Sequence, residues 1–278
     1  MSTVVHATAE SILAHLKIVE GERRRRARQA GLIQAVDAVK AFQQRRFATT
    51  YRDLLASKRY GSASRFFLDE LYGPSDFTRR DAQFARVVPA LVRLFPTEVI
   101  QAVASLAQLH ALSEVLDTAM GVASDGSHVV DARNYIRVWQ ATGRASDRQA
   151  QIELTLGVAG RLDAFTRKPL LRSSLRLMRG PARAAGMIEL QQFLESGFDT
   201  FRAMKGAGEF IATVRMRELA LASNLFDADL GISPPTIATQ RAANHRVRAN
   251  RPPIAIASHA ALMARMPHGT SQRASDSN

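Results

Sequence analysis

Apolar side chains recur three and four positions apart along the first 230 residues, and this spacing is typical of helices. No stretch of strand length alternates apolar and polar residues, and few prolines interrupt these residues. The pattern therefore predicts an all-α fold, a single multi-helix domain with orthogonal or bundle-like packing.

The clearest helix covers residues 97–120, and its continuous apolar stripe predicts a central position in the fold. It follows Pro96 and is expected to end at Gly121, because glycine is common just past a helix C-terminus. Ser146 and Gln149 have the spacing of a capping box, which predicts the start of another helix. Further helices are predicted over about 31–57, 66–72, 79–95, 132–142, 169–179, 182–204 and 208–227.

The aromatic residues mark the part of the chain that can build a core. All of them, 13 Phe, 4 Tyr and 1 Trp, lie between residues 42 and 226. Residues 231–278 are rich in Pro and Ser and hold six arginines against one acidic residue. This composition buries too little apolar surface to offset the entropy of ordering, so we predict a disordered basic tail. The helical domain is then expected over 31–230.

Residues 1–30 are expected to form an amphipathic helix followed by a basic hinge. Four consecutive arginines, 23–26, step about 100° apart around a helix and so point in every direction. Such a turn is not expected to pack against a core on any side. Gly21 and Gly31 flank it, which favours a flexible connection to the main body.

Several classes of protein are disfavoured by what the sequence lacks. With no cysteine, the chain has no disulfides, thiolate metal sites or cysteine nucleophile. No uncharged apolar run approaches the roughly 18 residues of a membrane helix, and the N-terminus does not resemble a signal peptide, so a cytoplasmic protein is expected. Phosphate-loop, dinucleotide, nucleophile-elbow and zinc-protease motifs are absent, so an enzyme is less expected than a non-catalytic protein, and no cofactor is predicted.

Three phrases carry a resemblance to a known family: FFLDELYGPSDFTRRDAQF from residue 66, LRLMRGPARAAG from residue 175 and LQQFLESGFDTFRAM from residue 190. They resemble a bacterial, chiefly proteobacterial, family of hypothetical proteins with a domain of unknown function. The resemblance covers about residues 40–227. It implies one ancestral helical unit and brings no activity, ligand or catalytic residue with it.

A polar corner near residue 76 could bind an anion, because guanidinium groups beside a helix N-terminus suit phosphate or carboxylate. The alternative is that these side chains cap and pair within the corner. Thr78 and Asp81, for example, have the spacing of a capping box. The anion-binding candidates are Tyr72, Asp76, Arg79, Arg80 and Arg86.

A basic stripe follows further along the chain and could meet phosphate groups or an acidic partner. The alternative is an ordinary solvated helix face. Its members lie around one predicted helix and are Arg167, Arg172, Arg176, Arg179 and Arg183.

His110, Glu114 and Asp117 share one face of the central helix, a spacing that could supply metal ligands. The Glu-x-x-His pattern of helical metal sites is absent, so no metal is predicted and His110 is expected to be a partly buried, hydrogen-bonded residue. Tyr135 and Trp139, one turn apart, are expected to belong to the core.

The sequence thus favours a non-catalytic helical protein that binds an acidic protein or anionic ligand through arginine-rich surfaces. This interpretation requires that the arginines are not mostly neutralised by carboxylates of the same chain. The alternatives are a nucleic-acid-associated protein, and an enzyme or small-ligand-binding bundle with a pocket between residues 66–86 and the 97–120 helix. Self-association through the last two predicted helices is a further alternative.

Overall fold

The computed structural model describes residues 7–70, 77–125 and 131–230. In these ranges the chain is helical and forms no strand, which confirms the predicted all-α fold. The predicted tail, 231–278, lies outside the described ranges. The helices are α1 (Ala9–Arg28), α2 (Leu32–Thr50), α3 (Arg52–Ala56), α4 (Gly61–Glu70), α5 (Thr78–Leu94), α6 (Thr97–Ala123), α7 (Ala132–Thr142), α8 (Ala145–Thr166), α9 (Pro169–Leu177), α10 (Arg179–Ala184), α11 (Ile188–Ala203) and α12 (Gly208–Asp227).

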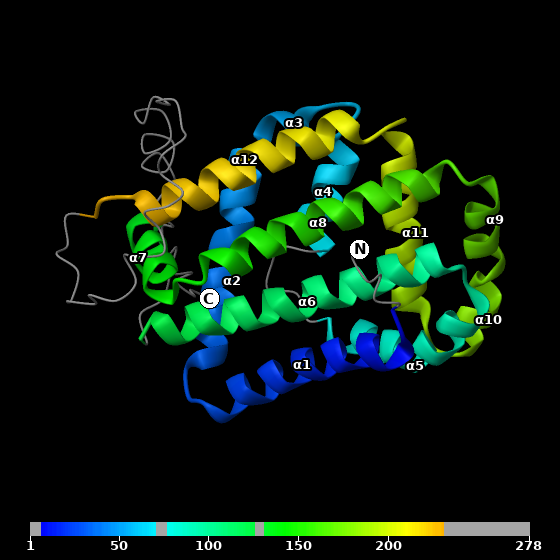
Figure 1. Cartoon of the computed structure of the whole chain (residues 1–278), viewed down its shortest axis with the longest axis horizontal. Helices are drawn as coiled ribbons and strands as arrows, with labels where there is room; N and C mark the ends of the chain where they lie inside the picture. The colour runs from blue at the N-terminus through cyan, green and yellow to red at the C-terminus, as the bar shows by residue number, and fades with distance from the viewer. Residues whose placement is uncertain (1–6, 71–76, 126–130, 231–278) are drawn as a thin grey trace, which may run out of the picture.

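Helix α6 is central, as the sequence predicts. Helix α1 packs along one side of it and α8 along the other, and α12 packs on the far side of α8 (Figure 1). Helix α2 crosses behind this layer and also packs on α6 (Figure 1). Helix α7 lies at one end of the molecule, and the short helices α9 and α10 lie at the opposite end (Figure 1).

Three clusters of buried apolar residues hold these helices together. The first surrounds Phe201 and joins α11 and α12 to α2, α4 and α8. The second joins α2, α6, α7 and α12, and contains the stacked rings of Phe42 and Tyr135, whose centroids are 4.5 Å apart. The third joins α1, α5 and α6 around Ile12 and Val88. Tyr135 and Trp139 are buried in the second cluster, which confirms their predicted place in the core.

By length and composition, α6 could cross a membrane, although no membrane helix is predicted from the sequence. The core helix of a soluble protein passes the same test. Helix α6 contacts α1, α2 and α8, and its buried Glu114 forms an ion pair with Arg26 at 2.5 Å. These contacts place α6 among other helices of the chain, with 33% of its most apolar stretch buried.

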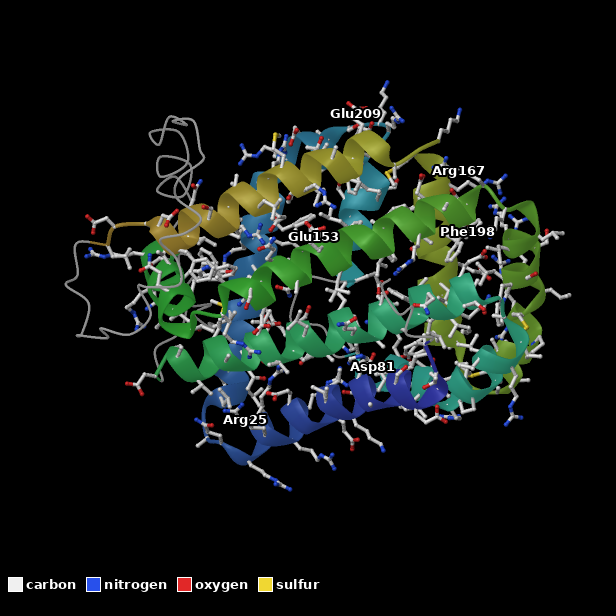
Figure 2. The ribbon with its side chains drawn as sticks, viewed as in Figure 1. Arg25, Asp81, Glu153, Arg167, Phe198 and Glu209 are labelled. Atoms are coloured by element: carbon white, nitrogen blue, oxygen red, sulfur yellow. The ribbon has the colours of Figure 1, made fainter. Side chains whose placement is uncertain are left out.

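The prediction of a basic hinge is wrong, because no hinge interrupts Ala9–Arg28. Helix α1 continues without interruption through Gly21 and the arginine run, and the chain turns at Gly31, where φ is 75°. Arg26 is only 7% exposed, because its charge is matched by Glu114 and its Nε donates to the hydroxyl of Thr118. Arg25, by contrast, lies on the outer side of α1 (Figure 2). A single turn of arginines can therefore pack on one side when a buried carboxylate faces it.

The predicted capping boxes do not form. Helix α8 begins at Ala145, one residue before Ser146, and no side chain caps it. Gly143 and Arg144 both have positive φ, 64° and 61°, and this reversal of the chain sets the start of the helix. At the start of α5, the N-cap position likewise has no side-chain cap, and the carboxylate of Asp81 bonds elsewhere.

Gly121 does not end the central helix, which continues to Ala123. A Cβ atom at this position would lie 2.6 Å from Cγ2 of Val36 and 3.0 Å from Cδ1 of Leu32. Both neighbours are buried on α2. The glycine is therefore required by the close approach of α2, and not by the geometry of a helix end.

Gly121→Ala is expected to lower the free energy of unfolding by about 1–3 kcal/mol, because the added methyl group forces α2 away from α6. Chemical denaturation measures this loss. Gly157→Ala in α8 is the matched control, since nothing lies within 4 Å of its added Cβ. The control is expected to gain up to about 1 kcal/mol from helix propensity. Equal effects at the two positions would contradict the packing explanation.

Candidate functional site

Two of the predicted anion-binding residues, Arg79 and Arg80, form ion pairs within the chain. Tyr72 and Asp76 lie outside the described residues. Arg79 forms an ion pair with Glu189, with Nε and Oε1 3.2 Å apart, and Arg86 is exposed without an ion pair to any described residue.

Arg80 is the most deeply placed of these candidates. Its Nη1 donates to Glu70 at 3.0 Å, and its guanidinium lies 3.9 Å from the ring centre of Phe77 and 4.4 Å from that of Phe193. Burial lowers the pKa of this guanidinium. Arg80 therefore joins α5 to α4 and α11.

Asp81 connects three helices. Its Oδ2 accepts a hydrogen bond from Arg23 of α1 at 2.6 Å and lies 2.8 Å from Nε2 of His110 on α6. Burial would raise the pKa of Asp81, but His110 and Arg23 outweigh it and lower that pKa. His110 is thus partly buried and hydrogen-bonded, as predicted.

The other two polar residues of this α6 face meet different partners. Glu114 accepts from Lys40 at 2.9 Å in addition to its pair with Arg26, and Asp117 accepts from Gln43 at 3.1 Å. No group of three or more His, Asp or Glu side chains among the described residues is arranged to hold a metal ion.

The basic stripe around α9 is partly neutralised within the chain. Arg167 bonds to Asp163, Arg172 to Asp199 at 2.9 Å, and Arg179 to Glu195. Arg176 and Arg183 are exposed and form no ion pair with any residue that the structure describes. The stripe is therefore less strongly charged than its arginine count indicates.

Exposed leucines accompany these arginines, a feature that the sequence analysis did not single out. Leu170 and Leu177 are 78% and 79% exposed, and Met178 is 43% exposed. Leu170 and Leu177, seven residues apart, lie on one face of α9, and Met178 follows directly after the helix. Leu171 and Leu175 lie on a neighbouring face and are less exposed. The sequence does carry a signal for this surface, because α9 has only nine residues and its leucines lie on more than one side of the helix.

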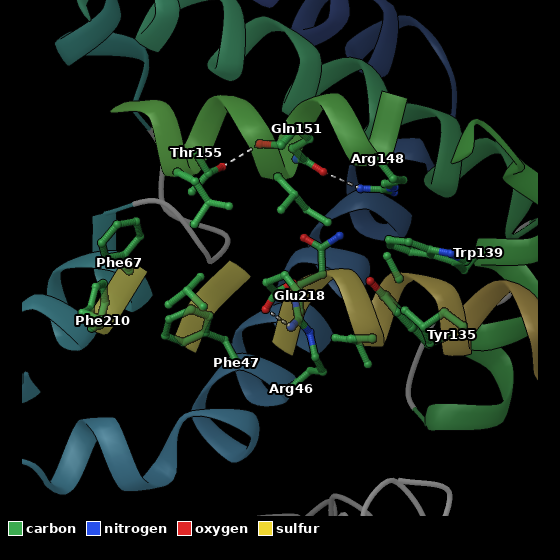
Figure 3. Close-up of a pocket in the computed structure, with 17 residues that line it drawn as sticks. Arg46, Phe47, Phe67, Tyr135, Trp139, Arg148, Gln151, Thr155, Phe210 and Glu218 are labelled. Carbon is green, nitrogen blue, oxygen red and sulfur yellow. Dashed lines mark hydrogen bonds and ion pairs between the residues drawn. The ribbon is translucent and has the colours of Figure 1, made fainter. Parts of the chain in front are cut away.

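A narrow crevice lies elsewhere, between α2, α7, α8 and α12. Its cavity volume, the space that the centre of a water-sized sphere can reach, is about 50 Å³. Three phenylalanines lie at one end of it, and Trp139 and Arg148 lie at the other (Figure 3). The sequence proposed a pocket between residues 66–86 and the 97–120 helix. Among the described residues of that region, only Phe67 lines the crevice.

The comparisons with known proteins identify a family. A family model with the description "Domain of unknown function (DUF8198)" matches residues 22–231. The chain belongs to this family. The DUF8198 domain begins in the second half of α1 and includes every later helix that the structure describes, so the arginine run, the basic stripe around α9 and the crevice all lie inside it. Neither a curated protein nor a solved structure matches the chain.

Proposed function

We propose that this DUF8198 protein is a non-catalytic binding protein whose α9–α10 end takes an acidic, amphipathic segment of a partner protein. One observation carries the proposal: Leu170, Leu177 and Met178 are exposed at the α9–α10 end, where Arg176 and Arg183 are also exposed and form no ion pair with any described residue. We define these five residues as the α9 surface.

Charge supports an acidic occupant. Residues 167–187 contain six basic and no acidic side chains, so the segment is positive even where carboxylates from other helices partly neutralise it. The leucines favour a protein partner over nucleic acid, since phosphate backbones are contacted through charge and hydrogen bonds. An amphipathic acidic helix can cover the exposed apolar side chains with its apolar face and pair its carboxylates with the arginines. A bacterial origin and a cytoplasmic address are part of this proposal.

A designed helical peptide rich in Glu and Leu is a suitable probe, with a Lys and Leu peptide of the same pattern as its control. The protein is expected to bind only the acidic peptide, more weakly at higher salt, as measured by fluorescence anisotropy. The double variant R176E/R183E is expected to bind about tenfold more weakly or worse. Leu177→Ser is expected to weaken binding as well, which separates an apolar contact from simple charge attraction.

The matched control is the double variant R24E/R25E on α1, which makes the same charge change at exposed arginines far along the chain. It is expected to bind the acidic peptide nearly as well as the unchanged protein. Equal losses in the two double variants would contradict the α9 surface. Binding to anionic vesicles but not to the peptide would overturn the protein partner in favour of a membrane surface.

A further inference from the structure

The strongest further feature is the crevice between α2, α7, α8 and α12. We propose that it is a binding site for a small, linear amphipathic carboxylate, with the carboxylate beside Trp139 and Arg148 and the apolar chain between the phenylalanines at the other end. This site is separate from the α9 surface, and neither proposal depends on the other.

The crevice contains a hydrogen-bond donor without a partner among the described residues. The indole nitrogen of Trp139 is buried and makes no hydrogen bond within the described part of the chain, although the residue is only 7% exposed. A buried N–H without an acceptor is unfavourable, and buried tryptophans usually find a partner for it. Trp139 lines the crevice, and we assign its N–H to an acceptor on the bound molecule.

A positive charge lies beside that donor. The guanidinium of Arg148 lies 4.2 Å from the ring centre of Trp139 and is 4% exposed. Its Nη1 donates to Gln151 at 3.1 Å, and its Nη2 is 2.9 Å from Sδ of Met120. Positive charge next to an indole N–H favours an anionic acceptor over a neutral one.

The other end of the crevice is apolar. Phe47, Phe67 and Phe210 lie together at the end opposite Trp139 and Arg148 (Figure 3), and the rings of Phe67 and Phe210 are 5.8 Å apart. The separation of a polar and an aromatic end matches a ligand with one polar group and an apolar body. The crevice is narrow, which favours an unbranched chain over a bulky ring system.

An ion pair lies in the middle of the crevice, and it leaves the donor at the Trp139 end available to the ligand. Glu218 accepts from Nη1 of Arg46 and from the hydroxyl of Tyr51, both at 2.7 Å. Arg46 and Glu218 lie between the two ends of the crevice (Figure 3). The carboxylate of Glu218 is thus held by its own donors, so its charge does not exclude an anion from the Trp139 end.

Trp139 is the single tryptophan of the chain, so its fluorescence reports directly on the site. Decanoate is the probe, and decylamine and decanol are controls with the same chain but a positive or neutral end. Decanoate is expected to change the emission of Trp139 with saturation at one equivalent, whereas decylamine leaves it unchanged and decanol binds at least about tenfold more weakly. Equal responses to all three compounds would overturn the carboxylate site.

Two alanines of α12 provide a matched pair of variants. Ala222 lines the crevice, whereas Ala220 is exposed two residues earlier. Ala222→Leu narrows the crevice and is expected to weaken decanoate binding about tenfold or more, and Ala220→Leu is expected to leave it unchanged. Binding that survives Ala222→Leu in a folded protein would overturn the location.

Trp139→Phe, followed by calorimetry, tests the donor itself. The phenylalanine keeps the apolar contact and removes the N–H, so decanoate binding is expected to weaken about tenfold. Unchanged affinity in this variant would overturn the role of the indole nitrogen. If Ala222→Leu does not fold, the Trp139→Phe result decides the proposal alone.

Discussion

Replacing Glu114 with glutamine is expected to lower the free energy of unfolding by about 3–5 kcal/mol, because it leaves two buried cations without their counter-ion. Glu114 is 4% exposed and meets Arg26 at 2.5 Å and Lys40 at 2.9 Å. Both cations come from other helices, α1 and α2, so the substitution loosens the packing of both on α6. Thermal or urea unfolding at neutral pH measures the loss.

The pH dependence of stability gives an independent test of the same residue. Burial alone would raise the pKa of Glu114, but Lys40 and Arg26 outweigh it and lower the pKa from 4.5 to about 2. A carboxyl group whose pKa is lower in the folded state stabilises the fold above its unfolded pKa, and this stability is lost as the pH falls towards 2. The contribution is about 3 kcal/mol, and Glu114→Gln is expected to remove that part of the acid dependence.

Asp117→Asn is the matched control, the same chemical change one turn further along α6. Burial raises the pKa of Asp117, so the folded state disfavours its charge at neutral pH. The substitution is expected to leave stability unchanged or to increase it, since the asparagine oxygen still accepts from Gln43. Equal losses in Glu114→Gln and Asp117→Asn would contradict the ion-pair explanation and indicate that α6 tolerates no change on this face.

The sequence predicted the helical class and the central helix because both depend on local spacing. The apolar stripe of residues 97–120 was long and uninterrupted, and α6 covers it and three residues more. Helix starts were predicted less well. A capping box at Ser146 was plausible locally, but the positive φ of Gly143 and Arg144 determines where α8 begins.

The roles of the arginines could not be predicted from sequence, because their partners are distant along the chain. Arg26 and Glu114 are 88 positions apart, and Arg46 and Glu218 are 172 apart. The sequence therefore predicts a hinge at the run of arginines, although one of them, Arg26, is buried. For the same reason, the sequence overestimates the positive charge of the stripe around α9, because Arg172 and Arg179 bond to carboxylates of α11.

Phe201→Ala is expected to lower the free energy of unfolding by about 3–5 kcal/mol, because it removes buried apolar surface and leaves a cavity. Phe201 is 1% exposed, and its ring lies 6.0 Å from that of Phe67. It belongs to the cluster that joins α11 and α12 to the rest of the molecule. Neighbouring helices fix this cluster on several sides, so the site is not expected to collapse around the missing ring.

Leu177→Ala is the matched control for Phe201→Ala, because Leu177 is 79% exposed and its truncation is expected to change stability by no more than about 0.5 kcal/mol. Urea unfolding followed by circular dichroism measures both variants. A loss below about 2 kcal/mol in Phe201→Ala would mean that α11 and α12 repack around the gap, and so are held less firmly than the buried cluster indicates. A large loss in Leu177→Ala would instead mean that this leucine is covered in solution, as it would be in a complex between copies of the chain.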